Sequence, residues 1–330
     1  MNDRWIGLDI GGTKCAVVLA QVGRGIRILD KERFPTRTDL GFPQAFEKLC
    51  AAADSILART GTDPGALRGI GVSCGGPLDA ERGVILNPPN LPGWENVPLT
   101  AMLKERYSVP VSLQNDANAC ALVEWRLGAG RGCRDMIFLT MGTGMGAGII
   151  AGGRLLSGCC DMAGEVGHIR LAPDGPEGYG KSGSFEGFAS GGGMDRRARA
   201  WTKAQAEGGN PPQWLLDGHE IEETDVPLIA AYARRGDADA LRLFDEAGQR
   251  LGEGIAILAD VLNPRRVVIG SVFVRCEDLL RIPMEKALER EALPRVRENL
   301  EVLPAQTEEH LGDYAAVMAA LNAEEIDPMA

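Results

Sequence analysis

Three glycine-rich stretches have residue types and spacings that could hold phosphate. GPEGYGKS (175–182) matches the P-loop pattern G-x-x-x-x-G-K-[ST], and GTGMGA (142–147) matches the dinucleotide-binding pattern G-x-G-x-x-[GA]. The third stretch, GGTK (11–14), joins two apolar runs. Because backbone N–H groups in a glycine-rich loop can point at phosphate oxygens, each stretch is a candidate nucleotide site.

The first two stretches lack the element that their chemistry requires. A P-loop is followed by a helix, yet the segment after Ser182, GSFEGFASGGG, contains five glycines and predicts no sustained helix. The dinucleotide pattern also needs a helix, but GAGIIAGG (146–153) continues as an apolar strand. We therefore interpret both matches as accidental and keep a P-loop NTPase only as an alternative.

The apolar patterning around these stretches alternates between the periods of strands and helices, which predicts an α/β fold. Asp116 stands where one of the helices needs an N-cap. We expect strands at 4–10, 15–22, 25–34, 69–74, 109–114, 265–270 and 300–304, a strand-turn-strand unit at 136–153, and helices near 44–60, 117–128, 237–262, 276–291 and 309–323.

The chain contains two similar hairpins. Residues 6–20 (IGLDIGGTKCAVVLA) and 137–151 (IFLTMGTGMGAGIIA) are identical at five of fifteen positions and lie 131 residues apart. The repeat predicts two related domains that each present a glycine turn. Two such turns could close on a polyphosphate from opposite sides.

The charge balance argues against nucleic-acid and membrane partners. The chain has 35 basic and 46 acidic residues, a formal net charge of −11 and no Lys/Arg-rich run, so it would repel phosphate backbones and anionic lipids. Six glycines in the uncharged run 136–153 favour strands over a membrane span. Eight cysteines without a C-x-x-C pair, and an N-terminus without an export signal, favour a cytoplasmic protein that binds a small molecule.

Six motifs have the order and spacing typical of the ROK family, which comprises bacterial sugar kinases and sugar-responsive repressors of the actin, hexokinase and Hsp70 superfamily. The resemblance spans nearly the whole chain and implies two actin-like ATPase (ribonuclease H-like) domains with an interdomain cleft. We expect a small domain at 1–116, completed by a C-terminal helix at about 309–330, and a large domain at 117–308. ROK proteins are commonly dimers, so a homodimer is expected. The motifs are DIGGTK (9–14), GGPLD (75–79), PNLPGW (89–94), QNDANA (114–119), TMGTGMGAG (140–148) and GEVGHI (164–169).

The resemblance also implies roles for individual residues. Asp116 corresponds to the family's general base, which would accept the proton of the attacking sugar hydroxyl, although it could instead merely cap a helix. Asp9 resembles the acidic residue near the Mg²⁺ of the nucleotide. ATP would be bound by Gly11, Gly12, Thr13, Lys14, Gly142, Thr143, Gly144 and Gly270. The sugar would be bound by Gly76, Asn90, Asn115, Asp116, Glu165, His168 and Glu186.

Two segments depart from the family pattern. The family's usual segment C-x-C-G-x-x-G-C-x-E binds a structural zinc together with the histidine, but here Glu177, Tyr179 and Ser184 stand at the cysteine positions. We therefore expect no structural zinc and interpret GPEGYGKS as a remnant of this sugar loop. In the adenosine-side segment NPRRVVIGSV (263–272), Ser271 and Val272 replace glycines, which leaves the adenine contacts open.

The resulting hypothesis is an ATP- and Mg²⁺-dependent hexose kinase that phosphorylates the 6-hydroxyl of glucose. N-acetylmannosamine, N-acetylglucosamine, fructose and allose remain alternative acceptors, because the same residues would contact hydroxyls that these sugars share. A non-catalytic sugar sensor is a further alternative. A repressor of the family is not expected, because it would need a DNA-binding helix-turn-helix ahead of DIGGTK, which starts at residue 9.

Overall fold

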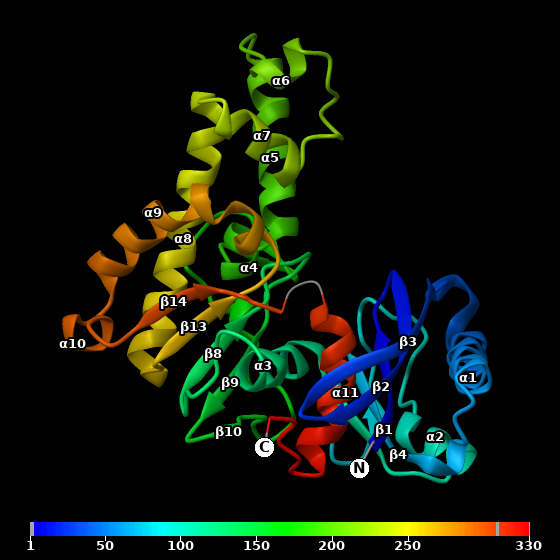
Figure 1. The fold of residues 1–330 in the computed structure, drawn as a ribbon. Helices are drawn as coiled ribbons and strands as arrows, with labels where there is room; N and C mark the ends of the chain where they lie inside the picture. The colour runs from blue at the N-terminus through cyan, green and yellow to red at the C-terminus, as the bar shows by residue number, and fades with distance from the viewer. Residues whose placement is uncertain (1–2, 308–309, 330) are drawn as a thin grey trace.

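The computed structural model describes residues 3–307 and 310–329, which contain two five-stranded sheets of the same topology (Figure 1). In each sheet an antiparallel hairpin comes first, and the later strands run parallel to the hairpin's first strand. The first sheet has the order β3 (Gly25–Pro35), β2 (Lys14–Gly23), β1 (Asp3–Ile10), β4 (Leu67–Cys74) and β7 (Val111–Asn115). The second has the order β10 (Arg154–Leu155), β9 (Ala147–Ala151), β8 (Met136–Leu139), β13 (Arg266–Ile269) and β14 (Glu301–Pro304).

Each sheet has an apolar core on its outer side. Two helices, α1 (Gly41–Arg59) and α2 (Leu99–Tyr107), pack on the first sheet. The core of the second sheet is built with more helices, several of which extend away from it in Figure 1. These are α4 (Phe185–Ala189), α5 (Gly191–Glu207), α7 (Val226–Arg234), α8 (Ala238–Leu262) and α9 (Val272–Glu291), with the short α6 (Gln213–Leu216) and α10 (Pro294–Arg297) beside them.

A third apolar cluster lies between the two sheets. It connects Trp5 of the first sheet with Phe138 of the second through α3 (Asp116–Arg126) and α11 (Leu311–Ala323), the two helices that lie between the sheets in Figure 1. The approach is close, because a Cβ on Gly148 in β9 would lie only 2.3 Å from the Cβ of Ala121 in α3. Helix α11 also contacts β1, β4 and β7, so the C-terminal helix packs on the N-terminal sheet.

The structure confirms the predicted hairpins and corrects the cap of α3. The two similar sequences form β1–β2 and β8–β9, which occupy equivalent places in their sheets. The predicted cap at Asp116 is wrong, because Asn115 is the N-cap residue. Its Oδ1 accepts hydrogen bonds from the N–H groups of Ala117 (3.0 Å) and Asn118 (3.3 Å). Because Asn115 caps the helix, Asp116 is not needed as the cap.

The absence of a sustained helix after Ser182 was also a wrong prediction. The glycine run begins α5, where the Oγ of Ser190 accepts a hydrogen bond from the N–H of Gly193 at 2.9 Å. The N–H of Gly192 donates to the carbonyl oxygen of Gly142 at 3.2 Å, so this helix starts directly against the glycine turn of the second hairpin. A capped first turn and this close packing outweigh the low helix propensity of glycine.

Two other helices differ from their expected starts. Helix α9 begins at Val272 rather than near 276, and a kink at Cys276 separates its first turn from the part that the sequence predicted. The terminal helix, expected from about 309, begins at Leu311, and residues 308, 309 and 330 lie outside the described residues. No helix in the described ranges is long and apolar enough to cross a membrane.

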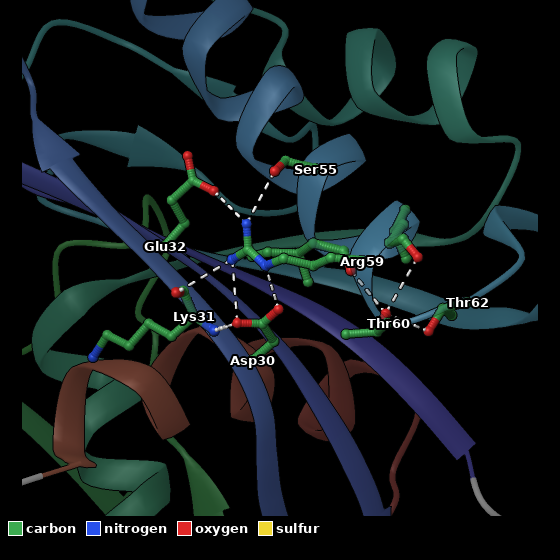
Figure 2. Close-up of polar contacts among 9 residues, drawn as sticks. Asp30, Lys31, Glu32, Ser55, Arg59, Thr60 and Thr62 are labelled. Atoms are coloured by element: carbon green, nitrogen blue, oxygen red, sulfur yellow. Dashed lines mark hydrogen bonds and ion pairs between the residues drawn. The ribbon is translucent and has the colours of Figure 1, made fainter.

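The edge strand β3 is tied to both of its neighbouring helices. Figure 2 shows the Arg59 guanidinium at the end of α1 between the carboxylates of Asp30 and Glu32, with an Nη1–Oε2 distance of 2.9 Å to Glu32. This pairing is largely exposed and contributes at most about 1 kcal/mol. Lys31 points away from the cluster in Figure 2 and forms an ion pair with Asp313 of α11. Strand β3 therefore connects α1 with the C-terminal helix.

A buried carboxylate joins α3 to the chain that returns from the second sheet. Glu124 is fully buried, and its two oxygens accept hydrogen bonds from the N–H groups of Ala129, Gln306 and Thr307 and from the hydroxyl of Thr307. The distances from Ala129 and from the Thr307 N–H are both 2.8 Å. Because 306–307 precede α11, Glu124 fixes where the chain leaves the second sheet.

Removing this carboxylate is expected to destabilise the protein. Glu124→Ala leaves several buried donors without an acceptor and should lower the free energy of unfolding by about 2–4 kcal/mol. Urea unfolding measures the loss, with Glu105→Ala on the exposed face of α2 as the control, for which less than about 0.5 kcal/mol is expected. Equal stabilities of the two variants would contradict the role given to Glu124.

Candidate active site

Two adjoining cavities share the glycine turn of the second hairpin. The larger has a volume of about 590 Å³ and the smaller about 520 Å³, and Gly142 and Thr143 line both. The larger cavity is bounded by Gly75–Pro77 from the first sheet's side and by the 161–168 loop from the second. A ligand in one cavity would therefore be adjacent to a ligand in the other.

The structure brings all seven residues predicted to bind the sugar to the larger cavity. Gly76, Asn90, Asn115, Asp116, Glu165, His168 and Glu186 all line it. They come from the ends of β4 and β7, from the start of α3, from the loop before α2, from the segment between β10 and α4, and from α4 itself. These segments lie far apart in the sequence and belong to both sheets. The cavity therefore forms only when the two sheets pack together.

Asp116 is the carboxylate at the N-terminus of α3. It is accessible from the cavity, and the surrounding protein raises the pKa of its carboxyl by limiting hydration. The N–H of Ala117, which donates to its Oδ1 at 2.8 Å, opposes that rise. A carboxylate with a raised pKa is a stronger base than one in open water.

Two further carboxylates share the cavity with Asp116. Glu186 Oε2 accepts a hydrogen bond from the N–H of Met145 at 3.1 Å, and a Cβ on Gly144 would lie 2.9 Å from the same oxygen. Burial raises the pKa of Glu165, with smaller effects from the charges of Asp116 and Glu186. The cavity thus concentrates acceptors that suit the hydroxyl groups of a polar ligand.

The loop that carries His168 is braced by a small hairpin. Strands β11 (Glu177–Gly178) and β12 (Lys181–Ser182) form where the P-loop pattern occurs, and Tyr179 lies in their turn. The Nζ of Lys181 donates to the carbonyl oxygen of His168 at 2.6 Å, and the Tyr179 ring stands edge-on to the His168 ring with centroids 6.4 Å apart. GPEGYGKS is therefore a β-hairpin rather than a phosphate loop.

Asp9 lies at the end of β1 in a second group of charges. Burial raises the pKa of Asp9 to about 7, with further contributions from Asp116 and Asp313, while Lys14 and Lys31 oppose the rise. The first turn of α11 is close, since a Cβ on Gly312 would lie 2.9 Å from Asp9 Oδ2. A buried carboxylate surrounded by other carboxylates is a favourable neighbour for a cation.

The residues predicted to bind ATP are divided between two places. Gly142 and Thr143 line both cavities, and Gly144 lines the larger one. Asp9, Gly11, Gly12, Thr13, Lys14 and Gly270 line neither cavity, although the glycine turn 11–14 approaches Asn90 closely. Ser271, beside Gly270, lines the smaller cavity with a positive φ of 56°, a conformation that glycine adopts more readily.

Several residues at the site were missed by the sequence analysis. Asp161, Met162 and Tyr179 line the larger cavity, and Asp195 and Arg234 line the smaller one. Lys31 and Asp313 were missed because their pairing joins residues 282 positions apart. No group of three or more His, Cys, Asp or Glu side chains that could hold a metal ion occurs in the described part of the chain.

The fold and site define a two-domain actin-like ATPase scaffold, and comparisons with known proteins agree. The chain is 36% identical over 304 residues to the glucokinase of Halalkalibacterium halodurans, covering 91% of this chain and 90% of that relative. It is 31% identical over 269 residues to the N-acetylmannosamine kinase of Citrobacter koseri, covering 80% and 82%. A ROK family glucokinase from Streptomyces griseus, solved in complex with glucose and AMPPNP, has a TM-score of 0.76 at 35% identity, covering 96% of this chain and 99% of that chain.

A family model described as the ROK family matches residues 5–323. The chain belongs to the ROK family. The family and the fold class predicted from the sequence are thereby confirmed.

The raised pKa of Asp9 predicts how the free energy of unfolding depends on pH. Between its usual value of 3.8 and about 7, the folded protein binds more protons at Asp9 than the unfolded chain, so the free energy of unfolding falls as the pH rises through this window. Asp9→Asn removes this loss and should be more stable than the wild type at pH 8, by at most about 4 kcal/mol, with a smaller difference at pH 5.

Urea unfolding of both proteins between pH 5 and pH 8 measures this difference. Asp63→Asn, at an exposed position, is the control and should follow the wild type at every pH. A wild type and Asp9→Asn variant with the same pH dependence would contradict the pKa of about 7.

Proposed function

We propose that this chain transfers the γ-phosphate of ATP to a hexose hydroxyl, with the 6-hydroxyl of glucose as the favoured acceptor. One observation carries the proposal: Asp116, at the start of α3, lines the same larger cavity as Gly142 and Thr143, which also line the smaller one. A sugar in the larger cavity and a nucleotide in the smaller one would meet at this junction.

Asp116 acts as the general base. Phosphoryl transfer depends mainly on in-line positioning and charge stabilisation, so the protein needs to supply little more than a correctly placed proton acceptor. The raised pKa of Asp116 supports this role, because a base is more effective when its pKa is nearer the working pH. The proton passes from the sugar hydroxyl to the carboxylate as the oxygen attacks phosphorus.

Glucose is favoured over the alternative sugars by the relatives. Asn90, Glu165, His168 and Glu186 can each accept or donate a hydrogen bond to neighbouring hydroxyls. These groups also suit an N-acetylhexosamine, and the relative named as an N-acetylmannosamine kinase keeps that sugar as a second candidate. The higher identity and coverage of the glucokinase relative support glucose.

ATP binds with its base in the smaller cavity and its phosphates along Gly142 and Thr143, facing the turn 11–14. Asp195 and Arg234 line the smaller cavity, and they provide polar partners for the nucleoside. Mg²⁺ brought with the phosphates would be held near Asp9, whose pKa is raised mainly by burial and further by the charges of Asp116 and Asp313. The positive charge of the ion would neutralise the phosphates during transfer.

The domain limits and the oligomeric state belong to the same proposal. Residues 1–116 and the C-terminal helix form the small domain and 117–308 the large one, which is supported by the packing of α11 on the first sheet. A homodimer is supported by apolar side chains exposed on the large domain. Val261 is 75% exposed, Ile282 62% and Leu293 59%.

A coupled ADP-release assay tests the function. ATP and Mg²⁺ are supplied with glucose, mannose, fructose, allose, N-acetylglucosamine or N-acetylmannosamine, and glucose should turn over fastest. Asp116→Asn should lower kcat by at least about 100-fold while glucose still binds in calorimetry. Near-normal turnover by this variant would refute Asp116 as the base, and a folded wild type silent on the whole panel would favour the non-catalytic sensor.

The hairpin that braces His168 makes a separate prediction. Lys181→Ala loses the hydrogen bond to the His168 carbonyl and should raise the KM for the sugar about fivefold, with kcat within about twofold. Lys181→Arg keeps a donor and should recover most of the KM, and Lys48→Ala on α1 is the control. A kcat that collapses in Lys181→Ala would instead favour a phosphate-binding lysine and the P-loop alternative.

A further inference from the structure

Two adjacent cysteines are exposed beside the larger cavity. Cys159 and Cys160 are exposed, whereas the other six cysteines of the chain are buried or half-buried. They are consecutive residues of one turn, and the neighbouring Cys159 thiol raises the pKa of the Cys160 thiol above its usual range. The loop thus presents two consecutive thiols at the surface.

The loop that carries these thiols reaches both the cavity and the first sheet's side of the molecule. The N–H of Ala163 donates to the carbonyl oxygen of Ser157 at 3.0 Å and closes the loop around the pair. The next residue, Asp161, has a positive φ of 57° and lines the larger cavity together with Met162. Its Oδ2 accepts a hydrogen bond from the N–H of Ala80 at 2.7 Å.

This hydrogen bond connects the two parts of the molecule. Ala80 follows β5 (Leu78–Asp79), which lies just after Gly76 and pairs with β6 (Val84–Ile85), whereas Asp161 belongs to the loop after β10 of the second sheet. A group bound to the neighbouring thiols would change the backbone of the loop at Asp161. Because Asp161 and Met162 line the larger cavity, that change would alter the wall of the proposed sugar site.

The chemistry of the pair narrows the ligand class. Adjacent Cα atoms are about 3.8 Å apart, less than the roughly 4.4–6.8 Å usual for a disulfide, so direct oxidation of the pair is disfavoured. Thiolates select soft ions. No third His, Cys, Asp or Glu completes a metal site in the described ranges. The pair therefore suits a soft centre that needs only two sulfur ligands from the protein. A trivalent arsenical carrying one organic group meets this condition.

We propose that Cys159 and Cys160 form a dithiol site for trivalent arsenicals, and that occupation of the site inhibits the sugar transfer proposed above by displacing Asp161 from Ala80. In water the arsenical is the hydrated form R–As(OH)₂, and in its reaction two sulfur–arsenic bonds form and two arsenic–oxygen bonds break. Each thiol proton leaves with one hydroxyl group, so two waters are released and nothing is oxidised or reduced. The site itself does not depend on the proposed function, whereas the inhibition does.

Intact-mass spectrometry of the full chain with phenylarsine oxide tests the site. One tightly held adduct is expected, stable to excess glutathione and released by 2,3-dimercaptopropanol. Cys159→Ser and Cys160→Ser should each weaken retention at least about 100-fold, because only one sulfur remains, and Cys120→Ser should behave as the wild type. An adduct retained equally by either single variant, or no adduct at all, would overturn the site.

Turnover measured on the same samples tests the inhibition. The wild-type adduct should lose at least about tenfold in kcat/KM for the sugar and regain it with 2,3-dimercaptopropanol, while both serine variants keep their activity in the presence of the reagent. An adduct with unchanged turnover would overturn the inhibition. Unmodified protein that turns over no sugar would refute the proposed function and the inhibition with it, while the mass measurement would still decide the site.

Discussion

The packing of α3 between two sheets is the constraint on which the site depends. The apolar side chains of this helix, together with α11, fill the space between the sheets. Its N-terminus carries Asn115 and Asp116, and its last turns carry Glu124, which holds residues 306–307. Because the body of the helix is shared by both cores, Asp116 has a fixed position relative to both hairpin turns. A surface loop would not give the carboxylate this precision.

Charge is the main cost of this arrangement. Asp9, Asp116 and Glu165 all have raised pKa values, chiefly because the surrounding protein limits the hydration of each carboxylate, and each lies near another carboxylate. Lys14 and Lys31 offset part of the repulsion at Asp9. Groups held away from their preferred protonation state are common where catalysis needs a base or a cation site. With these three carboxylates ionised, the protein is therefore less stable than the same scaffold with neutral residues would be.

Local patterning in the sequence predicted the strands of the two large sheets except β10, and the helices α1, α3, α8, α9 and α11, because alternation and helical spacing depend on near neighbours. It did not predict α2, α4–α7 or α10. The two hairpins and the strands before Asp116 are examples. The start of α5 could not be predicted, because a run of glycines there is stabilised by Ser190 and by contact with Gly142. The cap was misassigned because Asn115 and Asp116 are both good capping residues. An ion pair between residues distant in the sequence, such as Lys31 and Asp313, gives no pattern in the sequence near either residue. The residues proposed to bind the sugar were identified from motifs and not from periodicity.

The central claim is that α3 presents Asp116 to a sugar hydroxyl at the junction of the two cavities. A crystal structure with glucose and a non-hydrolysable ATP analogue tests it most directly. The account predicts one Asp116 carboxylate oxygen within about 2.6–3.2 Å of the 6-hydroxyl, with that hydroxyl facing the γ-phosphate near Gly142 and Thr143. A sugar bound with its 6-hydroxyl away from Asp116, or a nucleotide bound outside the smaller cavity, would contradict the account.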